Sequence, residues 1–87
     1  MLLQEFSELM VYVCRASGGK LSSSAIPIMD MLLAEGTKEL LIRSCLPYGI
    51  IAGIISSSVH EIEMGSLETV DRLVRKKALQ SLGMRSF

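Results

Sequence analysis

Apolar residues recur along the chain at helical spacing, and the pattern divides the chain into successive helical segments. The apolar positions of the first segment, residues 2–16, fall on one helix face: Leu2, Phe6, Leu9, Met10 and Val13. Recurrence at three and four residues indicates an amphipathic helix that packs on a core. Gly18 and Gly19 follow, and glycine supplies the left-handed residue with which such a helix often ends.

Glycine, proline and hydroxyl residues separate four further helical segments. We expect these helices at residues 25–35, 38–45, 47–63 and 67–82. Gly36 should close the second helix, Thr37 should cap the third and Ser66 should cap the last. Residues 50–55 contain enough β-branched side chains to suit a strand, but no segment sustains the alternation of a strand. The sequence therefore predicts a single all-α domain over residues 1–87, a compact bundle of about five short helices, with intertwining of two copies as an option.

Two segments carry so few charges that they should lie at the centre of the bundle. Residues 25–35 contain only Asp30 and Glu35 as charged residues, so almost the whole circumference of this helix is apolar. The apolar positions of the 47–63 helix fall on one side: Tyr48, Ile51, Ile55, Val59 and Ile62. Because an all-round apolar helix is typically buried, we expect these two helices nearest the centre.

The composition excludes disorder and favours a partner. Apolar residues make up 49% of the chain, and nine Lys and Arg balance nine Asp and Glu. Intrinsic disorder needs low hydrophobicity and high net charge, and a globally basic nucleic-acid binder needs a positive balance. A domain of this size buries only about 60–65% of its unfolded surface. We therefore expect a second chain to cover the remaining apolar surface.

The expected interface lies on the fourth helical segment and on the first. Gly49, Gly53 and Ser56 share one narrow strip of the 47–63 helix, and small residues at this spacing allow a second backbone to approach closely. Two interpretations remain open, a tight crossing within the chain and a crossing between two copies. Val11 and Tyr12 lie off the apolar stripe of the first helix and, together with Tyr48, complete the interface that we predict.

The last helix carries a cluster of cations that suggests an alternative partner. Its members are Arg72, Arg75, Lys76 and Lys77. Glu68 and Asp71 stand four residues before Arg72 and Arg75, an order that favours ion pairs and leaves Lys76, Lys77 and Arg85 free. Three free cations are fewer than the roughly 6–10 phosphate contacts of a strong binder, so a solvated helix face is favoured over nucleic-acid binding. No helix-turn-helix register fits the segments around Gly36 or Gly53.

Side chains with catalytic chemistry are few. His60 is the sole histidine, and it forms no recognisable nucleophile or metal pattern with Cys14 and Cys45. We therefore predict no catalytic residue, no metal and no cofactor. Two thiols that are far apart in the sequence indicate a reducing compartment. The acidic Glu5 and Glu8 argue against a secretory signal. Together, these two observations favour the cytoplasm.

A membrane role is not favoured either. The longest uncharged run, residues 44–59, spans sixteen residues, whereas a membrane-spanning helix needs about 20. The sequence thus favours a non-enzymatic regulatory or adaptor protein that acts through helix-mediated contacts, as a homodimer or with another protein. The alternative is a small DNA- or RNA-binding regulator that uses its basic last helix.

Overall fold

Five α-helices account for most of the chain in the computed structural model. The structure describes the backbone of residues 2–63 and 69–84, and within these the side chains of residues 5–61 and 69–83. The helices are α1 (Leu2–Ala16), α2 (Ala25–Leu32), α3 (Glu35–Arg43), α4 (Tyr48–Glu63) and α5 (Val70–Met84). The described ranges contain no strand, so the predicted all-α bundle of five helices is confirmed.

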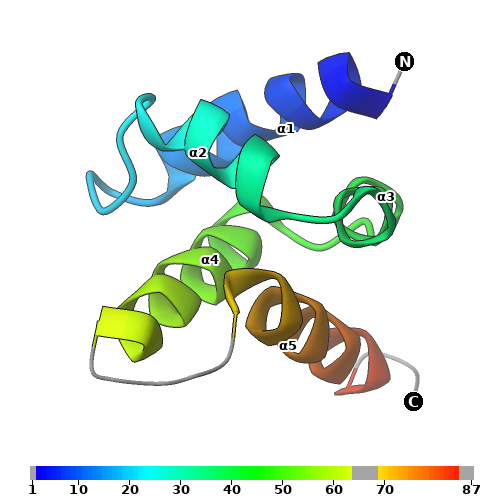
Figure 1. Ribbon diagram of the computed structural model, residues 1–87. Coiled ribbons are helices and arrows are strands. Elements are labelled where there is room, and N and C mark those ends of the chain that lie inside the picture. The colour runs from blue at the N-terminus through cyan, green and yellow to red at the C-terminus, as the bar shows by residue number, and fades with distance from the viewer. Residues whose placement is uncertain (1, 64–68, 85–87) are drawn as a thin grey trace.

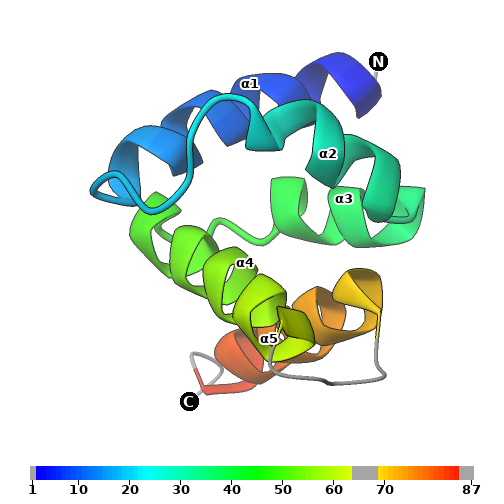
Figure 2. The ribbon, with the colours of Figure 1, turned by 60° about the vertical axis from the view of Figure 1, so that its left-hand side comes forward.

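The helices form two halves that meet where α1 packs on α4 and α3 packs on α5. Figures 1 and 2 show α1, α2 and α3 in one half of the molecule and α4 and α5 in the other. α4 packs against both α1 and α5, and α3 also packs against both α1 and α5, whereas α2 packs mainly on α1. No helix in the described ranges combines the length and the hydropathy that crossing a bilayer requires.

The apolar stripe of α1 lies in the core, as its spacing predicts. Phe6, Met10 and Val13 have no exposed surface, and Leu9 packs against them from a half-buried position. The opposite side of the core comes from α4, where Ile51 and Ile55 are almost fully buried. The prediction that this helix lies at the centre is therefore confirmed.

The prediction that the second helix lies at the centre is wrong. Of the eight residues of α2, only Met29 is buried, and Ile28, Met31 and Leu32 are exposed. A helix of two turns that packs mainly on one neighbour can bury only one stripe, however apolar its other side is. α2 therefore lies at the edge of the bundle.

The α2–α3 boundary also differs from the sequence pattern. α2 ends at Leu32 and α3 begins at Glu35, so Gly36 lies within α3 and does not close the preceding helix. Thr37 is fully buried and is the third residue of α3, so it cannot cap the helix. The N-cap residue is Ala34, and the Asp71 carboxylate accepts its N–H at 2.8 Å. A cap from a residue so distant in sequence removes the need for a local one.

The other helix ends deviate less. α3 ends at Arg43 instead of residue 45, and the following turn places Cys45 at φ 57°. Gly18 and Gly19 adopt positive φ after α1, as expected. α5 continues to Met84, two residues past the predicted end. Ser66, the predicted cap of that helix, lies outside the described residues, and so do the side chains of Leu2 and Ile62.

Candidate association surface

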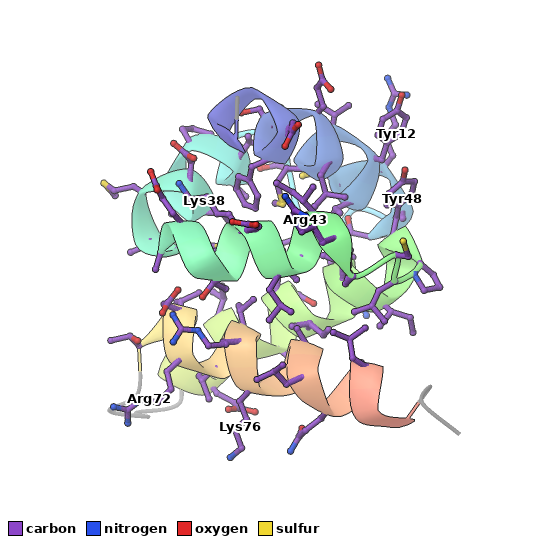
Figure 3. All side chains as sticks on the ribbon, turned by 90° about the vertical axis from the view of Figure 1, so that its right-hand side faces the viewer. Tyr12, Lys38, Arg43, Tyr48, Arg72 and Lys76 are labelled. Carbon is purple, nitrogen blue, oxygen red and sulfur yellow. The ribbon has the colours of Figure 1, made fainter. Side chains whose placement is uncertain are left out.

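Tyr12 on α1 and Tyr48 on α4 form a stacked pair on the outside of the molecule. Their ring centroids lie 5.3 Å apart and their planes differ by 15°. Tyr12 is 49% exposed and Tyr48 is 46% exposed, and Figure 3 shows both rings at the same edge of the molecule. The sequence places both residues in one interface, and the structure adds that they touch. Stacked rings that stay half exposed present a rigid apolar surface.

Val11 lies beside the stacked pair on the outer face of α1. Its side chain is 40% exposed, and it lines a shallow depression together with Glu8, Tyr12 and Arg15. The prediction that Val11 and Tyr12 point away from the core is therefore confirmed. Together with Tyr48, they place apolar surface where α1 passes the start of α4.

The small-residue strip of α4 is open. Gly49 and Gly53 are exposed, and a Cβ atom added at either glycine meets nothing within 4 Å. The Ser56 hydroxyl is half-buried and donates only a long hydrogen bond, 3.5 Å, to the Gly53 carbonyl. No described part of the chain crosses closely over these glycines. The interpretation as a tight crossing within the chain is therefore wrong at Gly49 and Gly53.

The outer face of α2 is a second apolar surface, which the sequence interpretation missed. Ile28 is 48% exposed, Met31 is 77% exposed and Leu32 is 43% exposed. The one charged residue of α2, Asp30, turns inward, and its carboxylate accepts a hydrogen bond from the Lys38 ammonium at 2.7 Å. Met29 and Met31 stand two positions apart, so they lie on different sides of a helix. This spacing was the available signal, since only one of the two can face the core.

Two of the four clustered cations of α5 pair with carboxylates that the structure describes. The Arg75 guanidinium binds Asp71 at 3.0 Å, as its spacing predicts, and donates a second bond to the Thr37 hydroxyl at 3.0 Å. Lys77, which we expected to be free, binds Glu61 of α4 at 2.7 Å, so that prediction is wrong. Its partner lies 16 positions away, beyond the reach of helix-spacing rules.

Arg72 and Lys76 point away from the bundle on the outer side of α5 (Figure 3). Neither side chain pairs with a residue that the structure describes, whereas Glu68, the predicted partner of Arg72, lies outside the described residues. Arg85 also lies outside them. The described face of the basic helix thus presents two unpaired cations one turn apart.

The residues with reactive side chains lie apart from one another. His60 is exposed near the end of α4, and Cys45 is exposed between α3 and α4. Cys14 is half-buried, its thiol lies 3.5 Å from the Ser22 carbonyl, and burial raises the pKa of the thiol. Within the described part of the chain, no three His, Cys, Asp or Glu residues are grouped closely enough to hold a metal ion.

No family model, curated protein or solved structure matches this chain. The geometry of its surface is therefore what bears on its function.

Proposed function

We propose that this chain is a non-enzymatic regulatory or adaptor protein of the cytoplasm that acts through helix-mediated contacts as a homodimer. The contact surface consists of Val11, Tyr12, Tyr48, Gly49, Gly53 and Ser56, which we call the α1–α4 surface. The observation that carries the proposal is the open glycine strip next to an exposed tyrosine stack.

The glycine strip favours a helix as the occupant of this surface. Glycine costs about 1 kcal/mol relative to alanine within a helix, so two exposed glycines weaken α4 without stabilising any described contact within the chain. Close approach by a second helix would account for these glycines, since small residues allow two backbones to pack tightly.

The tyrosine stack favours a specific contact at the end of this strip. Tyrosine combines large apolar area with a polar tip and few rotatable bonds, and it is enriched in interfaces for this reason. Because the two rings already hold each other, ordering them on association costs little further entropy. A second copy of the chain would cover the stack and Val11 together.

Sedimentation velocity at low micromolar concentration tests the proposal. We expect a dimer of the 9.5 kDa chain, and Gly53→Leu should raise its dissociation constant at least about tenfold while helicity by circular dichroism persists. Gly36→Leu is the matched control, because Gly36 is also an exposed helical glycine whose added Cβ meets nothing, but it lies on α3. A folded monomer at 100 μM, or a Gly53→Leu dimer of unchanged affinity, would refute the proposal.

Nucleic-acid binding by α5 is the alternative, and the outward direction of Arg72 and Lys76 is the observation in its favour. The two unpaired cations among the described residues of α5, or four in a dimer, remain below the roughly 6–10 phosphate contacts of a strong binder. Fluorescence anisotropy with a DNA duplex and an RNA hairpin at two salt concentrations separates the two functions. Steeply salt-dependent binding that Arg72→Gln weakens would support the alternative, and no binding at low salt would end it.

A further inference from the structure

A groove runs along α4 beside the turn that follows α1. Two cavities of about 630 and 140 Å³ share Lys20, Gly53 and Ser56 in their walls. Because they share these residues, the two cavities adjoin each other along α4 between Gly49 and His60, and together we call them the groove. The groove shares Gly49, Gly53 and Ser56 with the α1–α4 surface. Its far end, near His60, has side chains that the α1–α4 surface lacks.

The far end of the groove is lined by hydrogen-bond donors. The donors are Lys20, Ser56, Ser57 and His60, and Leu21, Gly53 and Val59 complete the lining. Among the described residues that line it, none is acidic. Neither the Lys20 nor the His60 side chain bonds to any residue that the structure describes, whereas Lys38 and Lys77 each bind a carboxylate. The groove therefore holds two donors without an acceptor.

The turn that carries Lys20 is held in place by a buried serine. The Ser17 hydroxyl donates to the Cys14 carbonyl at 2.6 Å and accepts the Leu21 N–H at 3.0 Å. Gly18 and Gly19 adopt φ 67° and 93°, which lets the chain reverse within this turn. The backbone of Lys20 is thus fixed beside α4, and Lys20 lines both cavities of the groove.

The α4 side of the groove combines an open floor at Gly53 with two serine hydroxyls. Gly53 has no side chain, so an oxygen atom of a ligand can approach the helix there. The Ser57 hydroxyl donates to the Ile54 carbonyl and accepts a hydrogen bond of 2.9 Å from Lys77. This bond places the Lys77 ammonium next to Ser57, and Glu61 balances its charge. The Ser56 hydroxyl, with only its long bond to Gly53, is available to a ligand.

We propose that this groove binds a small phosphate-bearing anion, with Lys20, His60 and Ser56 as its hydrogen-bond donors. A phosphate group offers several acceptor oxygens, and its bonds to charged donors are about twice as strong as neutral ones. An apolar ligand would leave the same donors without partners. Inorganic phosphate and a phosphate monoester share this chemistry, so both serve as probes.

Amide chemical shifts of the ¹⁵N-labelled full chain test the site. The chain is titrated with inorganic phosphate and, separately, with glycerol phosphate, each against sodium chloride at equal ionic strength. We expect saturable shifts centred on Lys20, Ser56 and His60, and Lys20→Gln should weaken binding about fivefold or more. Lys76→Gln is the matched control, because Lys76 is an exposed, unpaired lysine of α5, and it should leave the affinity unchanged.

The two probes also identify the source of the phosphate. Tighter binding of glycerol phosphate would assign a phosphorylated small molecule, whereas equal or tighter binding of inorganic phosphate would assign the free anion. Shifts no larger than those with chloride, shifts spread equally over Arg72 and Lys76, or an unchanged affinity of Lys20→Gln would each overturn the proposal. Gly53 and Ser56 also belong to the α1–α4 surface, so a second copy and the phosphate would compete for them. Sedimentation of the chain without phosphate judges the dimer separately.

Discussion

α2 and α4 carry few charges over most of their length, yet they occupy opposite positions in the bundle. α4 has sixteen residues and packs against α1 and α5, so it buries Ile51, Ile54 and Ile55. α2 has eight residues and packs mainly on α1, so it buries Met29 alone. Apolar composition therefore does not determine burial in this chain. The length of a helix and the number of its neighbours decide which apolar side chains reach the core.

The largest expected effect compares one isoleucine from each of these helices. Ile55 is fully buried and Ile28 is 48% exposed, so Ile55→Ala should lower the free energy of unfolding by about 2–5 kcal/mol. Ile28→Ala should change it by only about 0.5 kcal/mol. Urea unfolding followed by circular dichroism measures both variants. Equal losses of unfolding free energy in the two variants would mean that another chain buries α2, or that α2 contributes to the core of its own chain.

A smaller effect is expected from the ion pair that holds α2 to α3. Asp30→Asn leaves the Lys38 ammonium, whose side chain is 10% exposed, without its carboxylate. Because Asp30 itself is 29% exposed, we expect a loss of about 1–2 kcal/mol, less than for a fully buried pair. The same unfolding measurement applies.

Glu39→Gln is the control for this change, since it breaks the exposed pair with Arg43 in α3. An exposed pair at this spacing contributes about 0.3–0.5 kcal/mol. If both variants lose the same free energy of unfolding, water hydrates the Lys38 ammonium when Asp30 is neutralised. The ion pair then does not anchor α2.

The smallest expected effect is a difference in how urea changes the labelling rates of two thiols. It compares the local opening of α2 with the opening of α4. The Cys14 thiol lies beside Ser22, just before α2, and it should react when α2 detaches locally. In a Cys45→Ser chain, we expect its labelling rate to respond weakly to low urea concentrations, as local opening does. Burial raises the pKa of this thiol, so the rate is measured at about pH 8.5, where thiolate is more abundant.

The matched reporter is Ser58→Cys in a chain in which Cys14 and Cys45 are serine. Ser58 is fully buried in α4, so its cysteine should react only after global unfolding, with a steep dependence on urea. Equal urea dependence of the two thiols would show that α2 and α4 open together.

The periodicity of apolar residues predicted the helices and the buried face of α1, because those features depend on neighbours three and four positions apart. It could not predict which helix lies at the edge, since the near absence of charge in residues 25–35 is equally compatible with the core. The burial of Thr37 and Lys38 depends on Arg75 and Asp30, and no local pattern encodes such contacts.

The predicted interface also depends on contacts between helices that sequence spacing does not encode. Spacing along α4 placed Gly49, Gly53 and Ser56 on one strip, but the stacking of Tyr12 on Tyr48 joins two helices. The pairing of Lys77 with Glu61 likewise joins α5 to α4. Sequence spacing identifies a helix face, whereas the packing of the helices decides which faces are combined into one surface.

The hydrogen bond from the Ala34 N–H to Asp71 affects the order in which the chain folds. It spans 37 positions, so α3 receives its cap only after a long loop has closed, at an entropic cost. A nine-residue helix is too short to persist alone in water, since isolated helices below about 12–15 residues are marginal. During synthesis, we therefore expect α3 to remain largely unformed until the segment that becomes α5 has left the ribosome.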